Sequence, residues 1–385
     1  MNSNFHLPAL LVAGSILAPV VAQQTAEETP PTLEQRFQTR LDELRATNGF
    51  PGASLAAVLA DGKTVAVTSG FADVEDEVPL TSEDRLPSGS TGKTYVLAVF
   101  LQLVDEGKVG LDDRLSEYLG EEEWYPRLAN HDDITLRSLL NHTSGVSEHV
   151  YTKEMWDLSL AEPDRTFKPE ELVAYILDRE PLFEVGEGWS YADTNFILVG
   201  MVIDKVTEST YYEELRKRVL EPLKLKDTVP SDRRDIEGVI PGYTRKGTFG
   251  IPVSKVIGED GLFVLNPQLE WTGGGIASTP LDLARWGKLL YEGKAFGQEH
   301  LPAVLDGKRA NTGRGDEYGL GTQIWSTPQG RVHGHTGFFP GYQSAMAYYP
   351  EAKVVLAIQF NTDQREHLRR PVRSYLDEFA SMVIE

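Results

Sequence analysis

The feature that most constrains this chain is residues 86–97 (LPSGSTGKTYVL), where a turn-forming sequence changes into a helical one. Proline, serine and glycine crowd its first half, which is typical of a turn. From Thr91 onward, apolar residues recur at helical spacing. Ser90 is therefore expected at the start of a helix, with Lys93 one turn later on the same face. A hydroxyl and an amine placed in this way form a nucleophile with its own proton acceptor.

Two other interpretations fit parts of the same stretch. Taken alone, the motif leaves open a structural role in which Ser90 caps the helix and Lys93 is solvated. A phosphate-binding loop would end like Gly92-Lys93-Thr94, but its pattern requires glycine where this chain has Pro87. Because proline removes a backbone N–H donor, the nucleotide interpretation is weak.

Composition narrows the classes of partner and cofactor. The net charge of −21 argues against nucleic acid, whose phosphates would be repelled, and against docking to anionic lipid. The chain has no cysteine, which excludes disulfides, thiolate catalysis and cysteine-based zinc sites. His333 and His335 alternate on one expected strand without an evident carboxylate partner, so we expect no metal and no cofactor. The expected partner is a small acyl substrate: an ester, a D-amino-acid peptide or a β-lactam.

The N-terminal segment is apolar from residue 7 to residue 22 (LPALLVAGSILAPVVA) and is short for a membrane-spanning helix. It ends in small residues, as secretory signals do. We interpret residues 1–22 as a signal peptide, which predicts a secreted or periplasmic protein with no stable membrane partner after cleavage. Residues 23–32 are polar and rich in proline, which predicts a flexible leader.

Hydrophobic periodicity predicts the elements of the folded part. Helical patterns occupy residues 33–48, 280–290 and 364–383, and β-prone runs occupy residues 53–59, 64–69, 331–335, 343–349 and 354–360. Asp61-Gly62 between the first two runs is a strong hairpin signal.

The order of these elements predicts an α/β (α+β) fold. Its sheet is mainly antiparallel, is built from both ends of the chain (residues 33–104 and 266–385) and is flanked by helices. Residues 105–265 form a mostly helical insertion. Ser90 falls where the two parts meet, and clefts commonly form at such places.

Four further stretches give the chain a family resemblance. In order they are residues 134–145 (ITLRSLLNHTSG), 183–200 (FEVGEGWSYADTNFILVG), 273–283 (GGGIASTPLDL) and 334–337 (GHTG). With the Ser90 motif, they resemble the serine β-lactamase and penicillin-binding-protein superfamily over most of the mature chain. The branch concerned contains D-alanyl-D-alanine carboxypeptidases, class C β-lactamases and related esterases. The resemblance implies a β-lactamase/transpeptidase-like fold and a serine hydrolase that acts through an acyl-enzyme.

The resemblance also implies catalytic roles. Ser90 would be the acylated nucleophile and Lys93 the amine that accepts its proton. Tyr191 would relay a proton to the leaving group and activate the deacylating water. The backbone N–H groups of Ser90 and Phe338 would form the oxyanion hole.

Substrate-binding roles are implied for the third motif and for Asp193. Thr336 would hydrogen-bond a substrate carboxylate, and Gly337 would let the substrate backbone approach. His335 replaces the lysine of K-T-G, and we expect it to titrate near neutrality and to attract a substrate carboxylate when protonated. Asp193 replaces the asparagine of the usual Y-x-N motif, and its carboxylate would stabilise a charged Lys93.

The histidine of the third motif, His335, indicates which of the possible activities to expect. Carboxypeptidases of this branch can carry histidine there, whereas β-lactamases more often carry lysine. The sequence therefore favours a D-alanyl-D-alanine carboxypeptidase-like peptidase or a carboxylesterase over a class C-like β-lactamase. A non-catalytic penicillin- or peptidoglycan-binding protein is the alternative from another functional class.

Overall fold

The computed structural model describes residues 1–6, 30–312 and 315–384. The apolar segment of the expected signal peptide and most of the expected leader lie outside the described residues. Within the described ranges, no helix has both the length and the apolar character needed to cross a membrane.

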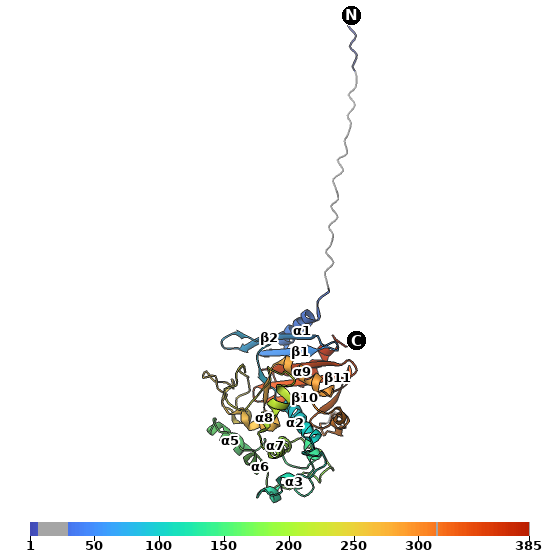
Figure 1. The fold of residues 1–385 in the computed structure, drawn as a ribbon. Helices are drawn as coiled ribbons and strands as arrows, with labels where there is room; N and C mark the ends of the chain where they lie inside the picture. Colours follow the sequence, from blue (N-terminus) through green and yellow to red (C-terminus); the bar gives the residue numbers. More distant parts are fainter. Residues whose placement is uncertain (7–29, 313–314, 385) are drawn as a thin grey trace.

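A nine-stranded antiparallel sheet forms the centre of the fold, and both ends of the chain contribute to it (Figure 1). In spatial order the strands are β3 (Val78–Pro79), β2 (Thr64–Asp73), β1 (Gly52–Val58), β12 (Val354–Phe360), β11 (Tyr342–Tyr349), β10 (Gly330–Phe339), β9 (Gln323–Thr327), β8 (Glu317–Tyr318) and β7 (Lys308–Arg309). The hairpin and the three C-terminal strands expected from the sequence are confirmed. The pairing of β1 with β12 joins the two halves of the sheet.

Helices cover both faces of this sheet. One face packs against α1 (Leu33–Asn48), η7 (Val372–Tyr375) and α11 (Leu376–Ala380). Phe37 of α1 meets Phe379 of α11 edge to face, with ring centroids 5.2 Å apart. The other face packs against α2 (Lys93–Asp105) and α9 (Pro280–Tyr291). The fold class expected from the sequence is confirmed.

The C-terminal helix differs from its prediction. The periodicity of residues 364–383 predicts one long helix, but the helical segments begin only at Val372. Pro371 accounts for the difference, because proline donates no N–H and disfavours helical geometry in the residue before it.

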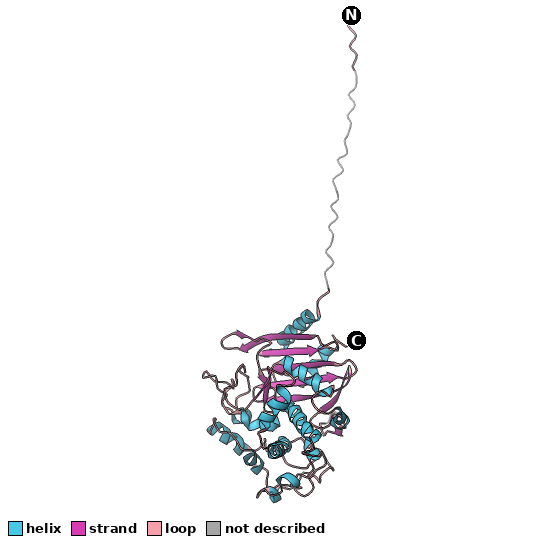
Figure 2. Ribbon diagram, in the orientation of Figure 1, coloured by secondary structure: helices cyan, strands magenta, loops and turns pink. Residues whose placement is uncertain are grey.

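The middle of the chain is mainly helical, and Figure 2 shows it as a group of helices and loops beside the strands. The elements are α3 (Ser116–Leu119), η2 (Tyr125–Arg127), α4 (Leu136–Leu140), α5 (Lys153–Ala161), α6 (Pro169–Ala174), α7 (Asp193–Thr207), α8 (Tyr211–Leu215), η3 (Arg216–Leu220), β5 (Val229–Pro230), η4 (Thr248–Gly250) and η5 (Pro267–Gly273). One hydrophobic core extends from Ala357 of the sheet through Phe100 to Phe196 of α7. Because the two parts share this core, the boundaries at residues 105 and 265 stay a prediction.

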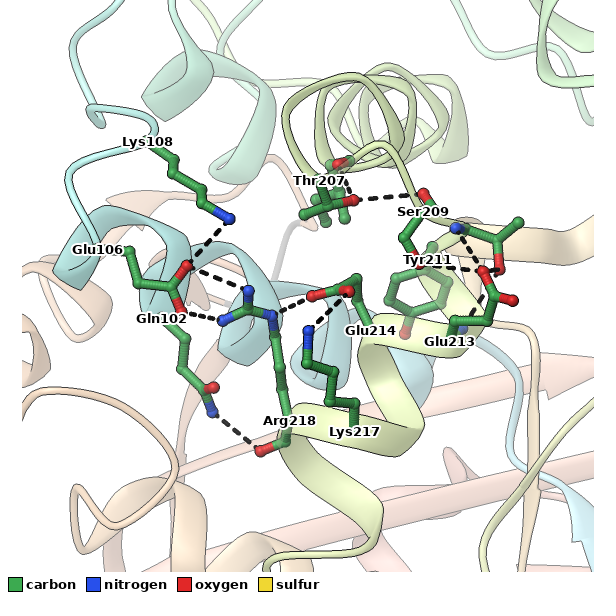
Figure 3. A network of polar contacts seen from close by, with 12 residues as sticks. Gln102, Glu106, Lys108, Thr207, Ser209, Tyr211, Glu213, Glu214, Lys217 and Arg218 are labelled. Carbon is green, nitrogen blue, oxygen red and sulfur yellow. Dashed lines mark hydrogen bonds and ion pairs between the residues drawn. The ribbon is translucent and has the colours of Figure 1, made fainter.

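A polar network holds the C-terminal end of α2, the helix that begins at Lys93 (Figure 3). Arg218 of η3 is almost enclosed and donates to Glu214 of α8 and to Glu106 just beyond α2. Gln102 of α2 donates to the backbone carbonyl of Arg218 at 3.2 Å. Hydrogen bonds between charged groups are stronger than neutral ones, and Arg218 is nearly enclosed although Glu106 is exposed, so these contacts hold the end of α2 against η3 and α8.

Candidate active site

Ser90 lies in a tight 3₁₀ turn, η1 (Gly89–Gly92), between the short strand β4 (Leu86–Pro87) and α2. The turn is wedged between two other segments. A Cβ atom on Gly89 would overlap the backbone of Phe338, and one on Gly92 would overlap the carbonyl of Gly274. Gly89 also has φ 51°, in the left-handed region that glycine adopts at little cost. Gly89 thus lets the turn pack directly against β10, and Gly92 lets it pack against the backbone of Gly274.

Lys93 is fully buried and faces Ser90. Its Nζ atom lies 3.1 Å from Ser90 Oγ and 2.5 Å from Asp193 Oδ1, and it also donates to the carbonyl of Gly273. Three acceptors match the three N–H groups of an ammonium. In the neutral amine two N–H groups suffice for Asp193 and Gly273, and the lone pair is left for the proton of Ser90.

Tyr191 lies on the other side of Lys93, with Nζ 5.0 Å from the centre of its ring. Among the described residues its buried hydroxyl has no hydrogen-bond partner. Burial, and next the carboxyl of Asp193, raise the pKa of Tyr191 well above its ordinary value, and only the nearby Ser90 hydroxyl opposes this effect. Tyr191 therefore stays protonated and serves as a proton donor rather than as a ready-made base.

The segment of residues 134–145, one of those that carry the resemblance, supports Tyr191 from behind. His142 Nδ1 accepts the backbone N–H of Ala192 at 3.3 Å and the side-chain amide of Asn195 at 3.0 Å. Asn195 Oδ1 accepts the hydroxyl of Ser144 at 2.7 Å. Asn195 is therefore committed to structure and does not replace the asparagine missing from the Y-x-N motif.

Asp193 begins α7 and occupies the place of that asparagine. It contacts Lys93, as expected from its charge. Burial raises the pKa of Asp193 above its ordinary value, although Lys93 acts in the opposite direction. The carboxyl of Asp193 thus lies at ion-pair distance from the amine of Lys93.

The predicted oxyanion donors lie beside each other. In a strand, the N–H groups of alternate residues point to the same edge. The N–H of Thr336 donates to Gln323 on the β9 side, so the N–H of Phe338 points to that side as well, beyond the last β9 partner at Gly334. The backbone of Phe338 packs there against Gly89 of the nucleophile turn.

Gly337 has a packing role that the sequence did not indicate. A Cβ atom at this position would overlap the carbonyl oxygen of Ser88 and come within 2.5 Å of Ser344 Oγ. Gly337 therefore makes room for the segment that carries Ser90, and its expected role of letting the substrate backbone approach stays a prediction.

His335 was expected to titrate near neutrality, and this prediction is wrong. His335 is fully buried, its Nδ1 lies 2.7 Å from the carbonyl of Thr336, and its Nε2 lies 2.9 Å from the hydroxyl of Tyr318. Burial, and next the charge of Lys93, lower the pKa of His335 to about 3. The ring therefore stays neutral at physiological pH and positions Tyr318 and the β10 backbone.

A cavity of about 290 Å³ opens beside Ser90. Its wall is largely aromatic: Trp156 and Phe249 stack at 4.3 Å, Phe338 lies 6.1 Å from Phe249, and Tyr151 stands at the rim with 82% of its surface exposed. The lining residues are Ser90, Glu148, His149, Val150, Tyr151, Trp156, Tyr191, Asp193, Phe249, Leu269, Glu270, Phe338, Phe339 and Pro340. This set contains no lysine or arginine.

Two carboxyl groups of this cavity were not singled out from the sequence. Burial alone would raise the pKa of Glu148, but its contact with His149 and its hydrogen bonds from the backbone N–H groups of Val150 and Asp193 together lower this pKa. Burial, and next Asp193, raise the pKa of Glu270 to about 8. Glu148 comes just after residues 134–145, and Glu270 comes just before the glycine run at residues 273–275. This closeness to two motifs of the resemblance is the sequence signal that could have identified both residues as part of the site.

A second cavity, of about 210 Å³, lies on the far side of Tyr191 and reaches Thr336. Thr336 Oγ1 donates to Gln323 at 3.2 Å there. Arg373 also lines it and pairs with Asp316 at 2.9 Å. Tyr191 thus stands between an acidic, aromatic cavity on the Ser90 side and a more polar cavity on the Thr336 side.

One group of described side chains far along α2 from Lys93 has the spacing of metal ligands: Asp105, Glu299 and His300. Asp105 already accepts from His300 at 2.6 Å and from the backbone N–H of Gly297 at 2.8 Å. These contacts account for both of its oxygens.

The nucleophile turn, the buried lysine and the facing tyrosine define the class as a serine hydrolase that acts through an acyl-enzyme. The profile of the family described as Beta-lactamase matches residues 37–380. The chain belongs to this family, which confirms the resemblance found in the sequence.

The chain is similar to relatives that are named for different activities. Penicillin-binding protein 4* of Bacillus subtilis is 23% identical over 339 residues, covering 86% of this chain and 72% of the relative. A D-aminopeptidase of Brucella anthropi is 25% identical over 319 residues, covering 81% of this chain. This chain spans only 56% of that relative's length. Lovastatin esterase of Penicillium rubens is 28% identical over 282 residues, covering 66% of each chain.

Solved structures agree with the fold. A D-stereospecific amidohydrolase from Streptomyces superposes with a TM-score of 0.75 at 28% identity, covering 88% of this chain and 98% of the other. The D-amino acid amidase of Ochrobactrum anthropi superposes with a TM-score of 0.77 at 24% identity, covering 91% of this chain and 98% of the other.

Proposed function

We propose that this serine hydrolase cleaves small amides or esters of amino-acid type. The acyl group would carry an ammonium and an apolar, preferably aromatic side chain, and the leaving group would be neutral. The observation that carries the proposal is the cavity beside Ser90, in which Glu148, Asp193 and Glu270 meet an aromatic wall without any lining lysine or arginine. An acidic, apolar cavity favours a ligand that is both cationic and apolar.

The second cavity favours a neutral leaving group. Arg373 is the cation among its described lining residues, and Asp316 already neutralises it at 2.9 Å. Among the described residues, a product carboxylate at Thr336 would therefore lack an unpaired positive partner, since His335 is neutral. We accordingly rank an amidase or esterase above a D-alanyl-D-alanine carboxypeptidase and above a β-lactamase.

The names of two relatives support the same choice. A D-aminopeptidase and a D-stereospecific amidohydrolase are 25% and 28% identical to this chain. Lovastatin esterase, at 28%, supports the inclusion of esters.

The proposed reaction uses the groups around Ser90 in turn. Lys93 as a neutral amine accepts the Ser90 proton while the hydroxyl oxygen attacks the carbonyl carbon. The backbone N–H groups of Ser90 and Phe338 stabilise the oxyanion. Tyr191 protonates the leaving amine or alcohol and becomes a phenolate. In deacylation this phenolate takes a proton from the water that attacks the acyl carbon, and Lys93 returns its proton to the departing Ser90 oxygen, so that all three groups regain their starting forms.

Labelling and turnover test this proposal together. A fluorophosphonate should add one adduct to Ser90, absent in Ser90→Ala and retained in Ser88→Ala, which removes a hydroxyl from the same segment. Among D-phenylalanine 4-nitroanilide, a D-alanyl-D-alanine peptide and a cephalosporin, the anilide should have the highest kcat/KM. Labelling without turnover of any substrate would favour the binding-protein alternative, and preference for the cephalosporin would favour a β-lactamase.

We also propose that the protein is exported. The apolar segment of residues 7–22 and its small terminal residues support this proposal. Expression of the full chain in a bacterial host, followed by fractionation and N-terminal sequencing, should give a mature chain that begins at Gln23. An uncleaved chain in the cytoplasm would contradict it.

A further inference from the structure

We infer that Glu270 binds the ammonium group of the substrate and thereby sets the preference for amino-acid acyl groups. The inference rests on the proposed function and assigns one residue to a recognition step within it. The three carboxyl groups of the Ser90 cavity, Glu148, Asp193 and Glu270, differ in the hydrogen bonds that they already make.

Asp193 and Glu148 are already occupied. Asp193 pairs with Lys93 at 2.5 Å. Glu148 Oε2 accepts the backbone N–H of Asp193 at 2.5 Å, while Oε1 accepts the N–H of Val150 at 3.0 Å and lies 3.2 Å from His149 Nδ1. Both oxygens of Glu148 therefore hold the backbone in place, and binding a ligand would require these bonds to break.

Glu270 is different. Among the described residues, the single hydrogen bond to its carboxyl comes from the N–H of Gly275, which reaches Oε2 at 3.1 Å. Oε1 has no protein donor there, and Glu270 lines the cavity beside Ser90. Asp193 Oδ2 also lacks a donor among the described residues, but the carboxyl of Asp193 is paired with Lys93. Glu270 is thus the carboxyl group of this cavity that has both a free oxygen and no ion-pair partner among the described residues.

The local backbone is arranged around this side chain. The next residue, Trp271, is buried and has φ 36° and ψ −120°, a costly conformation for a residue with a bulky side chain. Its ring packs against α7 at Gly200, where a Cβ atom would lie 2.8 Å from the ring edge. A Cβ atom on Gly274 would overlap Glu270 Oε1. Glycine at 274 and the strained Trp271 thus leave Glu270 its position in the cavity.

The described groups around Glu270 provide no cation that pairs with its carboxyl. Asp193, Glu148, Tyr191 and Lys93 surround it, and Lys93 is the sole amine among them, already committed to Asp193. Burial and Asp193 together raise the pKa of Glu270 to about 8, so the empty cavity favours its neutral form near pH 7. A substrate ammonium would supply the counter-charge that the protein does not provide, and would form a charge-assisted hydrogen bond.

The test compares two anilides that differ by one amino group: D-phenylalanine 4-nitroanilide and 3-phenylpropanoyl 4-nitroanilide. The wild type should prefer the first by at least tenfold in kcat/KM. Glu270→Gln should raise KM for the amino substrate by roughly 10–100-fold, the range expected for a lost hydrogen bond to a charged group, with kcat changed less than threefold. KM for the substrate without the amino group should stay within about twofold. The matched variant Glu148→Gln should keep the preference between the two substrates.

Each outcome separates the two proposals. A wild type that hydrolyses both anilides equally well overturns the proposed acyl class. A wild-type preference that survives Glu270→Gln, or that disappears in Glu148→Gln instead, overturns the assignment of Glu270 alone. An equal loss on both anilides in Glu270→Gln reduces Glu270 to a structural residue and also overturns the assignment.

Discussion

Replacing Asp193 by asparagine restores the usual Y-x-N motif and should move the acid limb of the pH–rate profile. Asp193 Oδ1 lies 2.5 Å from the Nζ of fully buried Lys93 and stabilises the ammonium, which cannot accept the proton of Ser90. A neutral amide removes that stabilisation. The acid limb of the kcat/KM profile should therefore move to lower pH.

The size of the shift follows from the charge separation. Two unit charges about 4 Å apart at an effective permittivity of about 20 attract by about 4 kcal/mol, equivalent to about 3 pH units. Burial raises the pKa of Asp193, so its carboxyl is less than fully charged at the low end of the profile. A downward shift of about 1–3 pH units is therefore expected. The plateau at high pH should stay within a few-fold of the wild type, because Asp193 takes no proton from Ser90.

The assay is kcat/KM for 3-phenylpropanoyl 4-nitroanilide, which has no ionisable group, between pH 5 and 10. Glu148→Gln serves as the control, since it neutralises another carboxyl of the cavity without touching Lys93. Circular dichroism at each pH shows whether both variants stay folded. An acid limb that is unchanged or moves upward in Asp193→Asn would refute the role of Asp193 as the stabiliser of the ammonium.

Three further predictions concern groups around the nucleophile. Lys93→Ala and Tyr191→Phe should each lower kcat about 10²–10⁴-fold, and a near-normal rate in either variant would remove that residue from the mechanism. In Tyr191→Phe, intact-mass spectrometry should also detect accumulated acyl-enzyme. Gly337→Ala should lower the free energy of unfolding by about 1–3 kcal/mol in urea titrations, because its methyl group would overlap the Ser88 carbonyl, whereas unchanged stability would mean that this contact relaxes freely. The pKa of His335 is about 3, so kcat/KM profiles for a neutral ester and a carboxylate-bearing peptide should run parallel above pH 5, and a divergence near pH 6–7 would show that His335 titrates there.

The sequence predicted those parts of the site that depend on local spacing. Ser90 and Lys93 are one helical turn apart, and their 3.1 Å contact follows from that spacing. The helix of residues 33–48 was also predicted, and the capping box at Thr32 explains its start. Such features involve neighbours along the chain, whose geometry the backbone dictates.

The parts that could not be predicted depend on distant segments. The neutrality of His335 follows from its enclosure with Tyr318 and Lys93, which come from other strands and helices. The position of Glu270 depends on the positive φ of Trp271, and no local pattern indicates that angle. The packing of Gly337 against the Ser88 carbonyl depends on two segments far apart in the chain, and no local pattern indicates it.

The pairing of β1 with β12 has a consequence for how the protein reaches its active form. Ala53 lies opposite Phe360, and the Ser88 carbonyl fits against Gly337, so the first and last thirds of the chain must meet before the site exists. Contacts of such long sequence separation form slowly, because loop closure precedes any gain from packing. A chain still emerging from the ribosome or from an export channel would hold Ser90 and Lys93 without the strand that completes the oxyanion hole. Catalytic competence would therefore arise only after the C-terminal strands are released, and the cell would be spared hydrolysis by unfinished chains.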